Sequence, residues 1–323
     1  MNRTITIVIV LLVAVIALST IVPLFPKRVP VEVDPLLEDV KILTPKNKQT
    51  QIIAIETSDI PVQAKTVISS KQVPIPASLH VALGVDESKD FSARIKAIHE
   101  LSRDLSNDEI RATYAFLDLK QHESDLPSGY LNALKNDVVN TLELQNSKPQ
   151  DLVQHLMDMY ADQGHDDVWR DYCVQHLSSF YSDISNDDEK QKVRNLFWKA
   201  TEETDKTIAG TALLAMTYNS DQPGFDKAKI SGRALAMFED KKCRRMVKTT
   251  ALQICARLDD KRVLPIAREI AASSALVPLR MSAIAALGTL GNESDRAMLE
   301  KYATSSDIRL SKSAQSALKR LKP

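Results

Sequence analysis

One stretch near the C-terminal end of the chain, "RMSAIAALGTLG" at residues 280–291, most constrains the fold. On a helix of 3.6 residues per turn its apolar residues form two separate stripes. The stripes are Ala283, Ala286, Leu287 and Leu290, and Met281, Ile284, Ala285 and Gly288. Because a helix that is apolar on two sides must be covered on both, we expect an inner helix, packed on its own partner and on neighbouring units.

An Ala-Leu pair recurs along the C-terminal part of the chain at intervals of 39, 35 and 31 residues. The pairs begin at Ala212, Ala251, Ala286 and Ala317. A cation stands six residues before three of them, at Lys206, Arg245 and Arg280. A period of roughly 30 to 40 residues with one helix pair per unit indicates a helical solenoid. The last helix, from about Ile308, is apolar on one face only, as expected for a terminal cap.

The composition also favours helices. Apolar residues make up 44% of the chain, aromatic residues only 5%, and there are just 8 glycines, a mix that suits an Ala/Leu/Ile/Val helical core better than a β-sandwich. "SNDE" at residues 106–109 is a capping box that marks a helix start. The sequence therefore predicts an all-α fold.

The residues from 278 to 318, "PLRMSAIAALGTLGNESDRAMLEKYATSSDIRLSKSAQSAL", resemble the bacterial HEAT-like repeat, also called the phycobilisome-lyase-type repeat. The matching positions are Arg280, Ala286, Leu287, Gly288, Leu290, Gly291, Asn292, Asp307 and Arg309. The pattern is weaker over 205–275, where the glycines are missing, and only architectural over 91–204. The resemblance implies a right-handed α-solenoid of HEAT-like helix pairs that binds other molecules, usually proteins.

Residues 4–26 carry no charge and, at ~1.5 Å per residue, are long enough to cross a hydrocarbon core of ~30 Å. We interpret residues 1–26 as a transmembrane signal anchor. A cleaved signal peptide is the alternative, because Ala17 and Ser19 are placed like a cleavage site. Lys27 and Arg28 favour a cytoplasmic side for the flank, whereas the short N-terminal tail favours export. We expect a single-pass protein of the bacterial inner membrane, with its helical domain in the periplasm.

Eight of the 14 prolines fall between Pro23 and Pro76, in a segment without sustained helical periodicity. Proline removes a backbone donor and disfavours helices, so this segment is predicted to be an extended linker. Four parts follow: the anchor or signal peptide at 1–26, a proline-rich linker at 27–88, an N-terminal helical region at 89–204, and HEAT-like repeats at 205–323.

The formal net charge is zero, but residues 241–323 contain 17 Lys and Arg against 7 Asp and Glu. Five of these cations lie in "DKKCRRMVK" at 240–248: Lys241, Lys242, Arg244, Arg245 and Lys248. They form either a solvated face or a binding patch for an anionic partner. Since the segment lacks interleaved aromatics and a DNA-reading motif, nucleic acid is not expected as the partner.

The segment "VWRDYCVQHLSSFYSDI" at 168–184 gathers four aromatics in a chain that has few. They are Trp169, Tyr172, Phe180 and Tyr181. As core residues they would anchor the join between the N-terminal helices and the repeats. As surface residues, Trp169 and Tyr172 would be a hot spot for a partner.

No residue is assigned to catalysis, to a cofactor or to a metal. HEAT-like di-iron enzymes use four His-Glu dipeptides at repeat spacing, whereas this chain has two, at His99-Glu100 and His122-Glu123. A second group, His155, His165, Cys173 and His176, fits no closed zinc pattern. The three cysteines, Cys173, Cys243 and Cys255, are interpreted as small buried hydrophobes.

The sequence thus predicts a membrane-tethered helical-repeat scaffold, not an enzyme and without a cofactor, that binds a protein partner and contacts the membrane through residues 4–26. Two alternatives remain open. One is a HEAT-like enzyme or enzyme subunit, either lyase-like or metal-dependent. The other is a secreted soluble repeat protein.

Overall fold

The structure, a computed structural model, describes residues 74–86 and 88–321 of the chain. Within these residues it contains fourteen α-helices, five short 3₁₀-helices and no strand. The predicted all-α fold is confirmed for this part of the chain. The predicted anchor and most of the predicted linker lie outside the described residues.

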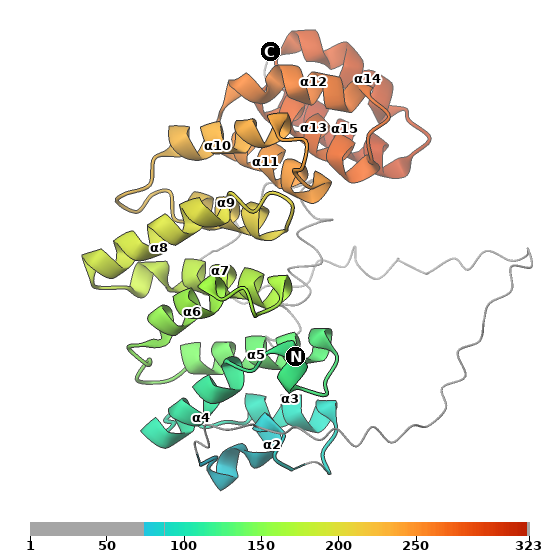
Figure 1. The fold of residues 1–323 in the computed structure, drawn as a ribbon. Coiled ribbons are helices and arrows are strands. Elements are labelled where there is room, and N and C mark those ends of the chain that lie inside the picture. The colour runs from blue at the N-terminus through green and yellow to red at the C-terminus, as the bar shows by residue number, and fades with distance from the viewer. Residues whose placement is uncertain (1–73, 87, 322–323) are drawn as a thin grey trace, which may run out of the picture. The chain divides into compact units, whose positions relative to one another are not determined.

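The helices form seven successive pairs in which the two members pack on each other (Figure 1). The first helices are α2 (His80–Leu83), α4 (Asn107–Leu117), α6 (Leu152–Ala161), α8 (Asp187–Ala200), α10 (Lys227–Glu239), α12 (Leu264–Ala272) and α14 (Arg296–Ala303). The second helices are α3 (Phe91–His99), α5 (Ser128–Glu143), α7 (Asp167–Phe180), α9 (Ile208–Tyr218), α11 (Arg245–Arg257), α13 (Val277–Leu290) and α15 (Ile308–Arg320).

The second helices hold the stack together. Each one packs on the second helix of the next pair, in an unbroken order from α3 to α15. The same pairing continues on the N-terminal side of residue 204, although the sequence shows no clear repeat pattern there. This arrangement is that of an α-solenoid, and its right-handed sense stays a prediction.

The Ala-Leu pairs all lie within second helices, near the middle of α9 and α11 and in the C-terminal half of α13 and α15. Seven of their eight residues are buried, and Leu318 in the last pair is half-buried. The interval found in the sequence is therefore the spacing between successive second helices. Small residues suit this place because two helix backbones approach each other there.

The helix at 277–290 is an inner helix, as predicted. In α13 the first apolar stripe is fully buried, and Ile284 and Gly288 of the second stripe are buried with it, while Met281 and Ala285 are half-buried. Its cover comes from three sides, because α13 packs on its partner α12, on α11 before it and on α15 after it.

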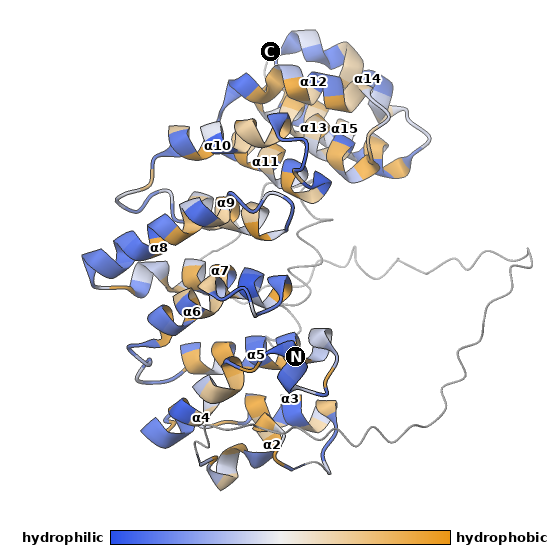
Figure 2. Ribbon diagram, in the orientation of Figure 1, coloured by the Kyte–Doolittle hydropathy of each residue, from blue (hydrophilic) through white to orange (hydrophobic). Residues whose placement is uncertain are grey.

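Helix starts are fixed by side-chain caps. Ser106 accepts a hydrogen bond from the backbone N of Glu109, whose side chain in turn accepts one from the backbone N of Ser106, so the predicted capping box is confirmed. Asp166 and Asp307 cap α7 and α15 in the simpler one-sided way. Figure 2 shows α8 as largely hydrophilic, and only Val193, Phe197 and Ala200 of that helix are buried.

The predicted location as a single-pass inner-membrane protein is corrected. Across residues 74–86 and 88–321, none of the helices combines the length and the apolar character needed to cross a bilayer. Residues 4–26, on which that prediction depended, lie outside the described residues.

Candidate functional site

The predicted basic segment forms the turn between α10 and α11 and the first turn of α11. Cys243 and Val247 are buried and hold the segment on the core. The backbone N of Arg244 donates a hydrogen bond of 2.8 Å to the carbonyl oxygen of Thr204, in the loop before α9. These contacts fix the path of the turn, and the residues between Cys243 and Val247 are exposed.

Four of the five predicted cations are exposed, namely Lys241, Lys242, Arg244 and Arg245. None of the four has a carboxylate within 4.0 Å in the part of the chain that the structure describes. Lys248 is different, because it is half-buried and its Nζ donates a hydrogen bond of 3.3 Å to the carbonyl oxygen of Phe238. That contact satisfies a carbonyl in the last turn of α10, so Lys248 has a local structural role.

Asp240 is the acid of this segment. Its carboxylate accepts hydrogen bonds from the hydroxyl of Thr204 and, at 2.8 Å, from the backbone N of Lys242. These two bonds, in that order of size, lower the pKa of Asp240. Asp240 is thus charged and occupied in fixing the turn, and it leaves the segment with a clear excess of positive charge.

Three large apolar side chains are exposed at the starts of the last three second helices. Met246 of α11 is 57% exposed, Leu276 before α13 is 56% exposed, and Ile308 of α15 is 64% exposed. Isolated exposed apolar residues are ordinary on protein surfaces, but one at the start of each of three successive second helices makes this region a candidate interaction surface.

The three helix starts lie on the same edge of the stack. Gln253 of α11 donates a hydrogen bond of 3.1 Å to Ser282 of α13, and Ser313 of α15 donates one of 3.1 Å to the carbonyl oxygen of Met281 in α13. The contacts Met281–Ser313 and Gly288–Ala317 follow the same order along α13 and α15, so these two helices run in the same direction. The contacts Thr204–Arg244 and Gly210–Thr250 do the same for α9 and α11. We call the group formed by the four exposed cations and the three apolar residues the helix-start surface: Lys241, Lys242, Arg244, Arg245, Met246, Leu276 and Ile308.

The aromatic cluster belongs to the core. Trp169, Phe180 and Tyr181 are buried, and Tyr172 is half-buried. The Tyr181 ring lies 6.5 Å from that of Phe197 in α8, so the cluster joins the α6–α7 pair to the next one. The structure therefore supports the interpretation of the cluster as core. Trp169 is not part of the candidate surface.

Trp169 also contacts a lysine that the sequence analysis did not single out. Lys135 of α5 is buried, and its Nζ donates a hydrogen bond to the carbonyl oxygen of Leu119 and lies 5.1 Å from the centroid of the Trp169 ring. Burial lowers the pKa of Lys135 to about 8. No local pattern distinguishes this lysine from an exposed one, because its environment comes from two successive helix pairs, α4–α5 and α6–α7.

The histidines do not converge on one place. His155 stacks on Tyr114 and lies 3.5 Å from Asp118, His165 contacts Lys120 at 2.7 Å, and His176 hydrogen-bonds Glu143 and Asn136. His99 contacts Asp137 at 3.1 Å, and His122 lies in the short 3₁₀-helix η3 (Gln121–Glu123). Among the described residues no group of three or more His, Cys, Asp or Glu side chains is placed to hold a metal ion.

No family model matches the sequence, and no curated protein matches it. A search of solved structures finds human deoxyhypusine hydroxylase in complex with glycerol, with a TM-score of 0.31 and 15% sequence identity. The match covers 75% of this chain and 96% of that one. At this level of similarity it is a distant likeness between helical folds and assigns no residue a role.

The prediction that the chain is not an enzyme is corrected. It depended on the helical-repeat fold and on the absence of a catalytic motif, whereas a solved structure found in the search is an enzyme by its name. A fold of this kind does not exclude catalysis, so we no longer hold that prediction.

Proposed function

We propose that this chain is a helical-repeat protein that binds a protein partner through the helix-start surface. The partner contributes an acidic segment that also carries apolar side chains. One observation carries the proposal: four exposed cations without a carboxylate partner lie on the same edge of the stack as three exposed apolar side chains.

The apolar residues supply affinity in this proposal. Covering a large aliphatic side chain is worth about 1.5–3 kcal/mol, so three such residues provide a useful anchor. The cations supply steering and register, which is the usual contribution of charges near the rim of an interface. A nucleic acid would match the cations but would leave Met246, Leu276 and Ile308 uncovered, which is why a protein partner is favoured.

The test uses a synthetic peptide of alternating Glu and Leu, labelled for fluorescence anisotropy. We compare the wild-type chain with the variant Lys241→Gln, Lys242→Gln, Arg244→Gln, Arg245→Gln. The control variant carries the same loss of charge at exposed lysines elsewhere: Lys192→Gln, Lys229→Gln, Lys261→Gln and Lys319→Gln. We expect the first variant to bind at least about tenfold more weakly, a change of ~1.4 kcal/mol, and the control to bind like wild type.

A second arm examines the apolar part of the surface. The variant Met246→Ser, Leu276→Ser, Ile308→Ser should also weaken binding of the Glu-Leu peptide, whereas binding of a peptide of alternating Glu and Ser should be weak for every variant. Equal losses in the two charge variants would overturn the proposal, because they would show non-specific attraction. Tighter binding of duplex DNA than of the Glu-Leu peptide, unaffected by the serine substitutions, would overturn it in favour of nucleic acid.

A further inference from the structure

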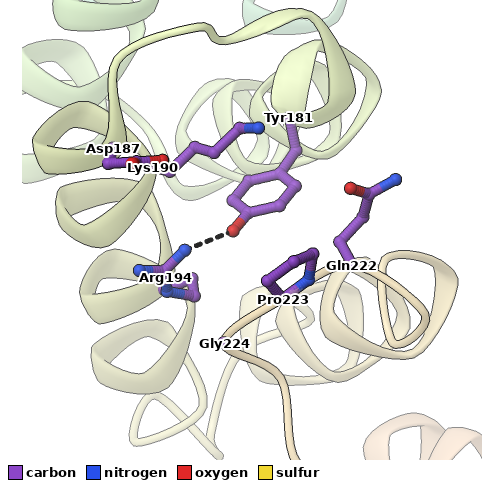
Figure 3. A pocket seen from close by; sticks show the side chains of 7 residues that line it. All are labelled: Tyr181, Asp187, Lys190, Arg194, Gln222, Pro223 and Gly224. Atoms are coloured by element: carbon purple, nitrogen blue, oxygen red, sulfur yellow. Dashed lines mark hydrogen bonds between the residues drawn. The ribbon is translucent and has the colours of Figure 1, made fainter.

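A pocket of about 160 Å³ lies between the first turns of α8 and the turn at 222–224 that precedes α10 (Figure 3). Its walls include Tyr181, which follows α7, and Asp187, Lys190 and Arg194 of α8. Three segments from successive helix pairs therefore meet here. No sequence motif marks the pocket, because its residues belong to different repeats.

Tyr181 forms the fixed base of this pocket. The residue is fully buried, and its ring lies edge-on to Phe225 with 5.1 Å between the ring centroids. Arg194 donates a hydrogen bond of 2.6 Å from Nη1 to the hydroxyl oxygen of Tyr181, as the dashed line in Figure 3 shows. The guanidinium is thus positioned by a hydrogen bond to the hydroxyl of a buried, well-packed side chain.

The turn at 222–224 fits closely against the same guanidinium. Gly224 has a φ of +92°, a conformation that favours glycine, and a Cβ added there would lie 2.7 Å from Nε of Arg194. On the other side, Nη2 of Arg194 donates a hydrogen bond of 2.7 Å to Oε1 of Gln191. Arg194 is therefore positioned by two neutral side chains and by a glycine turn, and no carboxylate among the described residues pairs with it.

The charges of the pocket are unbalanced. Neither Lys190 nor Arg194 has a carboxylate within 4.0 Å in the described part of the chain. The Nζ of Lys190 lies 5.9 Å from the centroid of the Tyr181 ring, at the outer limit of a cation–π contact. Asp187 is the one acid of the lining, and it is exposed. Two cations, one of them rigidly held, thus line a concave site with a single carboxylate.

The size of the pocket limits what it can hold. Sites for drug-sized ligands or whole cofactors measure roughly 300–1,000 Å³, so 160 Å³ has room for one functional group or a small ion. A planar guanidinium and an ammonium are the groups that proteins use to bind oxyanions, because charge-assisted hydrogen bonds are about twice as strong as neutral ones.

We propose that this pocket binds a phosphate group, held by Arg194 and Lys190 with the amide of Gln222 at its edge. The phosphate is favoured over a carboxylate because its three strong acceptor oxygens can accept hydrogen bonds from Arg194, Lys190 and Gln222 at once, whereas a carboxylate offers two oxygens. The group is either free inorganic phosphate or the phosphate of a phosphorylated peptide, and the two sources share this recognition chemistry.

The experiment uses the folded chain labelled with ¹⁵N and follows the backbone amide of Gly224 and the Nε–H of Arg194 during titrations. The probes are inorganic phosphate, sodium acetate and sodium chloride at equal ionic strength, and a short peptide with one phosphoserine beside its unphosphorylated form. We expect saturable shifts with phosphate or with the phosphopeptide, and only small linear shifts with chloride. The tighter of the two phosphate probes identifies the source.

Two substitutions in α8 test whether Lys190 contributes to phosphate binding. Lys190→Met removes a cation without touching the hydrogen bond between Arg194 and Tyr181, and it should weaken phosphate binding about tenfold, as expected for one charge-assisted contact. Lys192→Met, on the same helix but outside the pocket, should leave binding unchanged within about twofold. Shifts at Gly224 that are the same for phosphate and chloride, or the same affinity in Lys190→Met and wild type, would overturn the proposal.

Discussion

A Cβ atom added to Gly288 of α13 would lie 2.4 Å from the Cα of Ala317 in α15 and 2.5 Å from its Cβ. The two helix backbones therefore meet with almost nothing between them. Ala317 belongs to the last Ala-Leu pair and Gly288 directly follows the pair before it. This approach joins the last two repeats, and it depends on the smallest side chains at both positions.

Replacing Gly288 with alanine should destabilise the chain. The added methyl group would push α13 and α15 apart, and overpacking of a core costs about 1–3 kcal/mol, which exceeds the gain of about 1 kcal/mol from the better helix propensity of alanine. The free energy of unfolding in urea measures the change. Gly232→Ala in α10 is the matched control, since a Cβ there meets nothing within 4 Å, and it should stabilise or be neutral. Stabilisation of both variants would contradict the close approach.

The second prediction concerns the buried carboxylate of Asp295. It is 2% exposed and accepts hydrogen bonds of 2.7 Å and 3.0 Å from Nε and Nη2 of Arg268 in α12. Asp295→Asn should lower the free energy of unfolding by about 1–3 kcal/mol, because it leaves buried polar groups poorly paired. Asp125→Asn removes an exposed charge and should have no effect. Equal free energies of unfolding for the two variants would show that the Arg268–Asp295 pair does not stabilise the fold.

The third prediction is a pH dependence that originates at Glu203. Burial raises the pKa of this carboxyl, but hydrogen bonds from Arg170, Lys206 and Tyr160 outweigh that effect and lower it to about 2. A lowered pKa in the folded state stabilises the fold above the ordinary glutamate pKa of about 4.3, and this contribution is lost as the pH falls towards 2.

We therefore expect Glu203→Gln to lose less thermal stability than wild type between about pH 5 and pH 3, although it starts from a lower melting temperature. Glu202→Gln removes the neighbouring, exposed carboxylate and should follow the wild-type curve. Parallel curves for Glu203→Gln and wild type would contradict the assignment. Because Glu203 is partly open to solvent, high salt should reduce the effect.

The fourth prediction concerns the thiols. Cys173, Cys243 and Cys255 are all buried, and burial raises the pKa of each, that of Cys255 to about 12. A thiol reacts through its thiolate, so the folded chain should react slowly with Ellman's reagent at about pH 8 and release three equivalents only after denaturation. Cys243 should react first, because it lies in a turn and not inside a helix. Rapid reaction of all three in the folded chain would contradict this burial.

The repeats of the C-terminal half were readable because Ala-Leu recurs there at a near-regular interval. The N-terminal pairs stack in the same way, but the equivalent buried places in α5 and α7 are filled by Val138-Val139 and Cys173-Val174. These residues satisfy the same packing requirement with different side chains. A search for one recurring dipeptide therefore finds half of the stack.

The candidate sites were predictable to different degrees. The cations at 241–245 are adjacent in the sequence and lie in a turn, so their exposure could be expected from local structure alone. Trp169 could have been core or surface, and its contact with Lys135 of another pair decided the matter. The alignment of Met246, Leu276 and Ile308 on one edge could not be seen, because it requires that successive second helices run in the same direction.

The sequence by itself determined that this chain is helical and which helix faces must be covered, since side-chain periodicity fixes the faces of a helix before any long-range contact forms. It also located the exposed cations. Only the tertiary structure decided which helices cover those faces, where Gly288 meets Ala317, and how Tyr181, Arg194 and Gly224 come together around a pocket. Those relations join residues that are about 13 to 43 positions apart and belong to different helices or turns. The free energy of such contacts depends on how whole helices pack against one another, which no local pattern specifies.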